Sequence, residues 1–132
     1  MSAVTIRTAR GRTARGRTDG GAATAELALG LPLLLAVTVG LVWLLAVGAA
    51  QVRVVDAARE AARAAARGDA AGAAVQRGLR VAPTGSRVTL SRGDGRVTAR
   101  VAGEVGGPGG LFDWLPGVTV HAEAVAALEP GA

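Results

Sequence analysis

The stretch Gly21-Ala-Ala-Thr-Ala-Glu26, with the uncharged run Leu27–Ala50 that follows it, decides how this 132-residue chain is organised. The run contains 24 residues and no charged side chain. At about 1.5 Å rise per residue, a helix of this length crosses a hydrocarbon layer about 30 Å thick with some tilt. Glu26 stands directly at the entrance of the run. We therefore expect a membrane anchor, with a leader before it and a separate domain after it.

The positive charge of the chain is concentrated in the leader. Of the net charge of +5, residues 1–21 contribute +4 (five arginines, one aspartate) and residues 22–132 contribute +1 (ten arginines, nine acids). The leader repeats Arg-Thr-Ala-Arg-Gly and is predicted to be disordered. The positive-inside rule places it in the cytoplasm and residues 51–132 outside. Arg/Gly repeats can contact phosphates, but no aromatic residue interleaves to stack on bases, so we expect no nucleic-acid partner.

Two features inside the apolar run concern its helix. Pro32 lacks an amide hydrogen and leaves the carbonyl of Ala28 unpaired, which predicts a kink. Ala36 and Gly40 form a small-xxx-small pair that would let a neighbouring helix approach closely. Glycine is also simply common in membrane helices, and both interpretations stay open.

An amphipathic pattern begins at Gln51 and runs to Arg67. Charged residues cluster on one side of the helical wheel, and valine and alanine fill the other, so the apolar side needs cover. No helix breaker separates the two patterns. We predict one kinked helix from Thr24 to Arg67, in a segment 22–67 with a transmembrane part 27–50 and an amphipathic part 51–67. Gly68 is its predicted stop.

A small extracytoplasmic domain is predicted for residues 68–132, and the expected fold class is therefore α+β. Asp69 could cap a weak short helix over residues 70–77. Three stretches then alternate with period two, and Gly93-Asp94-Gly95 predicts a hairpin between the first two. The segment 111–115 is expected to pack across the sheet as a plug, with an adhesive or docking patch as the alternative role. Because the chain has only three aromatic residues, the core should be shallow, and the domain should lean on the long helix.

The residue types argue against an enzyme. The chain has no cysteine, and His121 is its one histidine, so no second ligand stands at metal spacing. Ser86 and Ser91 have no histidine nearby to act as a base. Phosphate loops and dinucleotide fingerprints are absent from the sequence. We expect no catalytic residue, cofactor, metal or small-molecule substrate.

Taken together, the Gly21/Glu26 spacing, Pro32 and the Ala/Arg-rich stretch 56–63 resemble a type IV prepilin of the TadE-like family. The resemblance covers residues 16 to about 68. It implies that a prepilin peptidase cuts between Gly21 and Ala22, which makes Glu26 the fifth mature residue. It also implies a pilin-like fold and a minor pilin or pseudopilin of the tight-adherence pilus, which serves cell adhesion. The implied partners are the peptidase, other pilins, the assembly platform and the cytoplasmic membrane.

Two other interpretations remain open. Gly48-Ala49-Ala50 could serve as a secretory cleavage site, although the apolar run is longer than the usual 7–15 residues of a signal-peptide core. The chain could also be an unprocessed single-pass anchor that carries a small binding domain.

Overall fold

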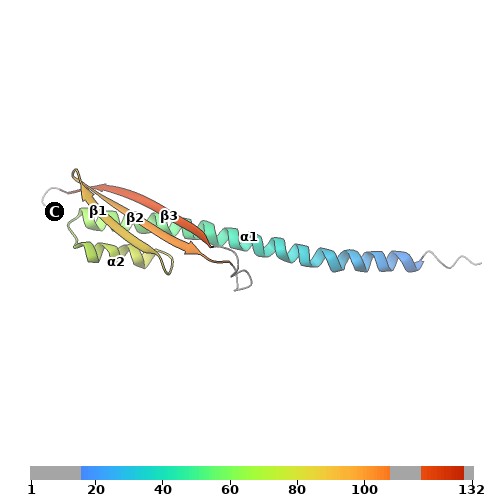
Figure 1. The fold of residues 1–132 in the computed structure, drawn as a ribbon. Helices are drawn as coiled ribbons and strands as arrows, with labels where there is room; N and C mark the ends of the chain where they lie inside the picture. Colours follow the sequence, from blue (N-terminus) through green and yellow to red (C-terminus); the bar gives the residue numbers. More distant parts are fainter. Residues whose placement is uncertain (1–15, 108–116, 130–132) are drawn as a thin grey trace, which may run out of the picture. The chain divides into compact units, whose positions relative to one another are not determined.

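The computed structural model describes residues 16–107 and 117–129 (Figure 1). The elements are α1 (Gly16–Ala66), α2 (Ala71–Val81), β1 (Arg87–Gly93), β2 (Arg96–Val105) and β3 (Val118–Ala127). A long helix, a short helix and one antiparallel sheet confirm the predicted α+β class. The chain divides into two compact units, Met1–Thr38 and Val39–Ala132, and the boundary lies inside α1.

In the first unit, α1 begins earlier than predicted. It starts at Gly16, not at Thr24, so the prediction of a disordered leader is wrong for residues 16–21; residues 1–15 lie outside the described part of the chain. The helix continues through Gly20 and Gly21, because glycine costs a helix only about 1 kcal/mol, far less than proline. The Thr24 hydroxyl donates to the Gly20 carbonyl at 2.8 Å, one turn back, which ties the glycine pair to the helix.

In the second unit, the amphipathic pattern of α1 is confirmed. The helix presents its valine and alanine side to the domain, and the arginines at 53, 59, 63 and 67 are exposed. The fully or almost fully buried helix residues are Val54, Ala57, Ala58, Ala61, Ala62, Ala64, Ala65 and Ala66. Asp56 lies 3.8 Å from Arg59 on this helix, and Glu60 lies 3.8 Å from Arg77 of α2.

The end of α1 is a glycine stop, as predicted. Gly68 has φ of 92° and its N–H donates to the Ala65 carbonyl, while the Asp69 N–H donates to the Ala64 carbonyl at 3.1 Å. This pair of bonds is the Schellman motif. The predicted cap role of Asp69 is wrong: Ala70 is the N-cap of α2 and makes no side-chain bond. The Asp69 carboxylate instead lies 3.1 Å from the Arg77 Nε, an ion pair that ties the α1–α2 loop to α2.

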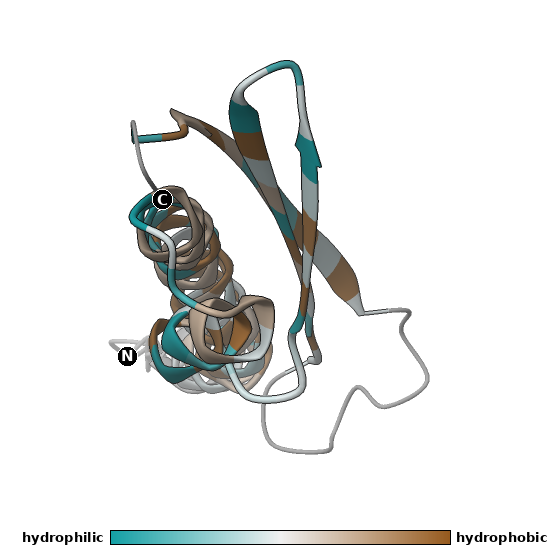
Figure 2. Ribbon diagram, turned by 90° about the vertical axis from the view of Figure 1, so that its left-hand side faces the viewer, coloured by the Kyte–Doolittle hydropathy of each residue, from teal (hydrophilic) through white to brown (hydrophobic). Residues whose placement is uncertain are grey.

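The three strands form one antiparallel sheet in the order β1-β2-β3. The predicted hairpin is present, because Gly93 pairs with Arg96 and both loop residues, Asp94 and Gly95, have positive φ (50° and 69°). Positive φ at both central positions defines a type I′ turn. Figure 2 shows both helices of the second unit on one side of the sheet, and none of the described helices or strands covers the other face.

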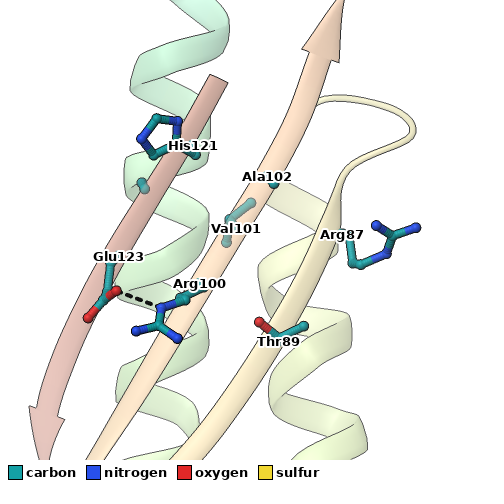
Figure 3. Close-up of a pocket in the computed structure, with 8 residues that line it drawn as sticks. Arg87, Thr89, Arg100, Val101, Ala102, His121 and Glu123 are labelled. Atoms are coloured by element: carbon teal, nitrogen blue, oxygen red, sulfur yellow. Dashed lines mark hydrogen bonds and ion pairs between the residues drawn. The ribbon is translucent and has the colours of Figure 1, made fainter. Parts of the chain in front are cut away.

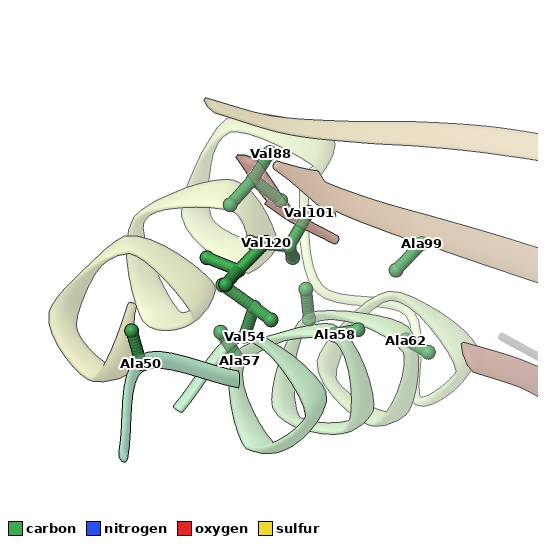
Figure 4. Close-up of a cluster of buried hydrophobic side chains, with 10 residues drawn as sticks. Ala50, Val54, Ala57, Ala58, Ala62, Val88, Ala99, Val101 and Val120 are labelled. Carbon is green, nitrogen blue, oxygen red and sulfur yellow. The ribbon is translucent and has the colours of Figure 1, made fainter. Parts of the chain in front are cut away.

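The core lies between α1, α2 and the covered face of the sheet. Val54 of α1 meets Val88, Val101 and Val120 from the three strands, with alanines filling the remaining contacts (Figure 4). The largest fully buried side chains are valines, so the core is shallow, as predicted. The domain also leans on α1, as predicted, since six of the ten buried residues of this cluster come from the helix. The plug predicted at 111–115 lies outside the described residues.

Candidate functional site

The predicted processing segment lies within the first unit of α1. Gly21, Ala22 and Glu26 are all helical and exposed. A side chain added at Gly21 would meet nothing within 4 Å. Ala22 and Glu26 are four residues apart, so they lie on the same helix face, one turn from each other. The segment is therefore sterically open to another protein.

Glu26 is the single charged group in an apolar surface of α1. Its neighbours on that surface are Ala23, Leu27, Gly30, Leu31 and Leu34. Salt bridges of Glu26 do not occur among the described residues. A carboxylate in such surroundings gains from any cation placed beside it, because a low dielectric strengthens the attraction.

The apolar run that follows is exposed over most of its length, and the exposure ends where Trp43, Val47 and Ala50 contact the rest of the second unit. Within residues 16–107 and 117–129, one helix, Gly20–Ala66, is long and apolar enough to cross a membrane, and only 6% of its most apolar stretch is buried. A soluble core helix would be mostly buried, so this exposure is consistent with a single-pass anchor. The Thr38 hydroxyl donates to the Leu34 carbonyl at 2.8 Å, which satisfies it inside the apolar stretch.

The predicted packing and kink residues also lie on this helix. Pro32 is internal to α1, and the helix continues through it, so the kink stays a prediction. Ala36 is exposed, and a side chain added at Gly40 would meet nothing within 4 Å. Each position is thus open to a neighbouring helix, as the small-xxx-small interpretation requires.

Two contacts between α1 and the sheet were not anticipated from the sequence. Trp43 is half-buried, and its Nε1 donates to the Gly106 carbonyl at 3.1 Å. The Gln51 Nε2 donates to the His121 carbonyl at 3.0 Å. These partners lie 63 and 70 residues apart in the chain, so no local pattern indicates them. The domain therefore contacts α1 at Trp43, which lies inside the predicted transmembrane part of the helix.

The face of the sheet opposite the two helices carries a shallow hollow of about 360 Å³ (Figure 3). The Arg100 Nε donates to the Glu123 carboxylate at 2.7 Å, while Arg87, Thr89 and His121 stand around it. No three histidine or acidic side chains of the described residues gather closely enough to hold a metal ion. The pair Arg100–Glu123 is solvent-exposed, and such pairs contribute at most about 1 kcal/mol.

Comparison with protein families gives a match to part of α1. Residues 21–63 match the family model described as TadE-like protein. This segment is TadE-like. The match confirms the expected family resemblance, and it begins at Gly21, includes Glu26 and Pro32, and ends within the amphipathic part of α1. The TadE-like segment therefore excludes α2 and the sheet. Searches of curated proteins and of solved structures found no match.

Proposed function

We propose that this chain is a minor pilin or pseudopilin that takes part in assembling a tight-adherence pilus. The TadE-like match relates the protein to that pilus system. The finer proposal rests on the position of Glu26. This residue lies five residues after Gly21, at the start of the exposed apolar stretch of α1 and inside the matched segment. The chain is proposed to act as a structural subunit and not as an enzyme.

The first step is processing by a prepilin peptidase between Gly21 and Ala22. A peptide bond inside a helix must leave the helix to enter a protease, and the pair Gly20-Gly21 lowers that cost because each glycine weakens the helix by about 1 kcal/mol. The exposure of both residues at the cut supports access. The product begins with a new amine at Ala22.

The second step is pairing of that amine with Glu26, in the same chain or in a neighbouring subunit. Both groups would lie at the membrane edge, where the surrounding apolar side chains strengthen their attraction. A pair between subunits would fix the axial register of packed helices. The open positions Ala36 and Gly40 support close packing of such helices.

The membrane arrangement follows from the same segment. The leader is proposed to stay in the cytoplasm, and the second unit outside the cytoplasmic membrane, where other pilins and the assembly platform are its partners. The pairing of the Ala22 amine with Glu26 involves only groups of this protein, so we propose no cofactor for it.

A secreted small domain is the alternative, but one observation disfavours it. Cleavage after Ala50 would cut α1 where Ala50 is 7% exposed and belongs to the core cluster. It would also remove Val47, which packs on that cluster, and Trp43, which bonds to Gly106. An unprocessed anchor would keep these contacts, and the mature N-terminus distinguishes it from a pilin.

The test is Glu26→Gln, which keeps the shape of the side chain and removes its charge. We expect the variant to insert in the membrane at wild-type level but to lose co-purification with the other pilins. Glu60→Gln is the matched control, because it removes an acid from the same helix outside the apolar run. Wild-type co-purification of Glu26→Gln would refute the register role of Glu26.

A further inference from the structure

The outer edge of β3 has a defined hydrogen-bonding direction. β3 pairs with β2 on one side only. In an antiparallel pair, successive residues direct their N–H and C=O groups alternately toward the partner strand and away from it. The Leu128 N–H donates to Gly95 at 2.9 Å in register with the β2 ladder, so even-numbered residues face β2. Odd-numbered residues of β3 therefore face outward.

The two ends of this outer edge are already satisfied by α1. The His121 carbonyl accepts from the Gln51 side chain at 3.0 Å, and the Glu129 N–H donates to the Ala66 carbonyl at 3.1 Å. Both are odd-numbered, which agrees with the outward direction. Between them, Glu123, Val125 and Ala127 direct their N–H and C=O groups outward, and none of the hydrogen bonds found outside the sheet ladder in the described residues involves these groups.

A groove runs beside this open stretch. It has a volume of about 340 Å³ and is lined by residues 123–126 of β3 and by Arg59, Ala62 and Arg63 of α1. At about 3.3 Å per residue, four strand residues extend about 13 Å. The groove therefore offers an extended backbone a row of unpaired partners on one side and a helix wall on the other.

The helix wall is cationic. Arg59 and Arg63 are one turn apart and exposed. The nearby acids of α1 are Asp56, which is 3.8 Å from Arg59 in a solvent-exposed pair of little strength, and Glu60, which is 3.8 Å from Arg77 of α2. The Glu123 carboxylate is held by Arg100 at 2.7 Å. A second copy of this chain would bring its own Arg59 and Arg63 toward these, and like charges repel. The charge of the wall favours an acidic segment from a different polypeptide.

We propose that the outer edge of β3, between His121 and Glu129, binds an extended acidic segment of a partner polypeptide as a fourth strand of the sheet. Main-chain bonds to Glu123, Val125 and Ala127 supply the pairing, and Arg59 and Arg63 select acidic side chains. Strand addition to an exposed edge is a known mode of peptide recognition. The inference depends on the second unit alone and does not rest on pilus assembly.

The test uses the full chain in detergent micelles and a blocked peptide, acetyl-Thr-Glu-Val-Glu-Thr-amide, as the probe. We expect the peptide to shift the amide resonances of Glu123, Val125 and Ala127 and to slow their hydrogen exchange. The same peptide with lysine in place of glutamate should bind at least about tenfold more weakly. If neither peptide perturbs these amides, or if the lysine peptide binds as well, the proposal is wrong.

Variants separate the backbone edge from the charged wall. Val125→Pro removes an outward N–H and should abolish binding, whereas Thr119→Pro removes an outward N–H beyond the Gln51 contact and should leave binding unchanged. Arg59→Glu with Arg63→Glu should weaken binding about tenfold or more, and Arg80→Glu on α2 should not. Circular dichroism checks that each variant is folded. Equal losses for groove and control variants, or cross-linked dimers through β3 without peptide, would overturn the proposal.

Discussion

Val54→Ala is expected to destabilise the second unit because α1 supplies the core of that unit. Val54 has no exposed surface and packs against strand valines. Two lost methyl groups correspond to about 1.6 kcal/mol of transfer free energy, and the space they leave adds about 1 kcal/mol. The higher helix propensity of alanine offsets about 0.5 kcal/mol. The net loss is about 2 kcal/mol, or a fall in Tm of about 8–16 °C for a domain of this size.

Thermal unfolding of the full chain in detergent micelles, followed by the fluorescence of Trp43 in a Trp114→Phe background, measures this effect. Val52→Ala is the matched control, because Val52 lies on the same helix but is 60% exposed. The control should raise the Tm slightly through helix propensity. A Val54→Ala variant that melts within about 2 °C of the wild type, or a control that falls as far, would refute the role of α1 in the core.

The remaining predictions concern the α1–α2 contact and the topology. Gly78→Val should destabilise the second unit by about 1–3 kcal/mol, because a Cβ there would lie 3.1 Å from the Ala61 Cβ and 3.2 Å from the Ala57 carbonyl. Gly72→Val is the control, because a Cβ at Gly72 of the same helix would meet nothing within 4 Å. Equal thermal stability of the two variants would contradict the close packing at Gly78. Protease added outside intact spheroplasts should digest the second unit and spare an N-terminal tag; a protected second unit would show the opposite orientation.

Local patterns predicted most of the fold. The uncharged run and the alternation of valine and alanine with arginine define α1 and its buried side from a few residues at a time. The period of two in the strands and the Gly93-Asp94-Gly95 turn also depend on neighbouring residues, which explains why the hairpin was predicted.

The errors and omissions involve residues far apart in the chain. Trp43 bonds to Gly106 and Gln51 to His121 across 63 and 70 residues, and no local pattern carries such pairs. Asp69 looked like a cap from its neighbours, but Arg77 lies beside its carboxylate once α2 folds back. The predicted start of α1 at Thr24 was eight residues late, because a helix can continue through a glycine pair at a cost of about 1 kcal/mol per glycine. The groove beside β3 likewise exists only after α1 and the sheet meet.

The mature N-terminus of the protein tests the central claim most directly. N-terminal sequencing of the chain purified from membranes, with and without the prepilin peptidase, distinguishes the three interpretations. The pilin account predicts Ala22 as the first residue when the peptidase is present and an intact leader when it is absent. A chain that starts at Gln51, or that keeps its leader in both strains, would contradict it.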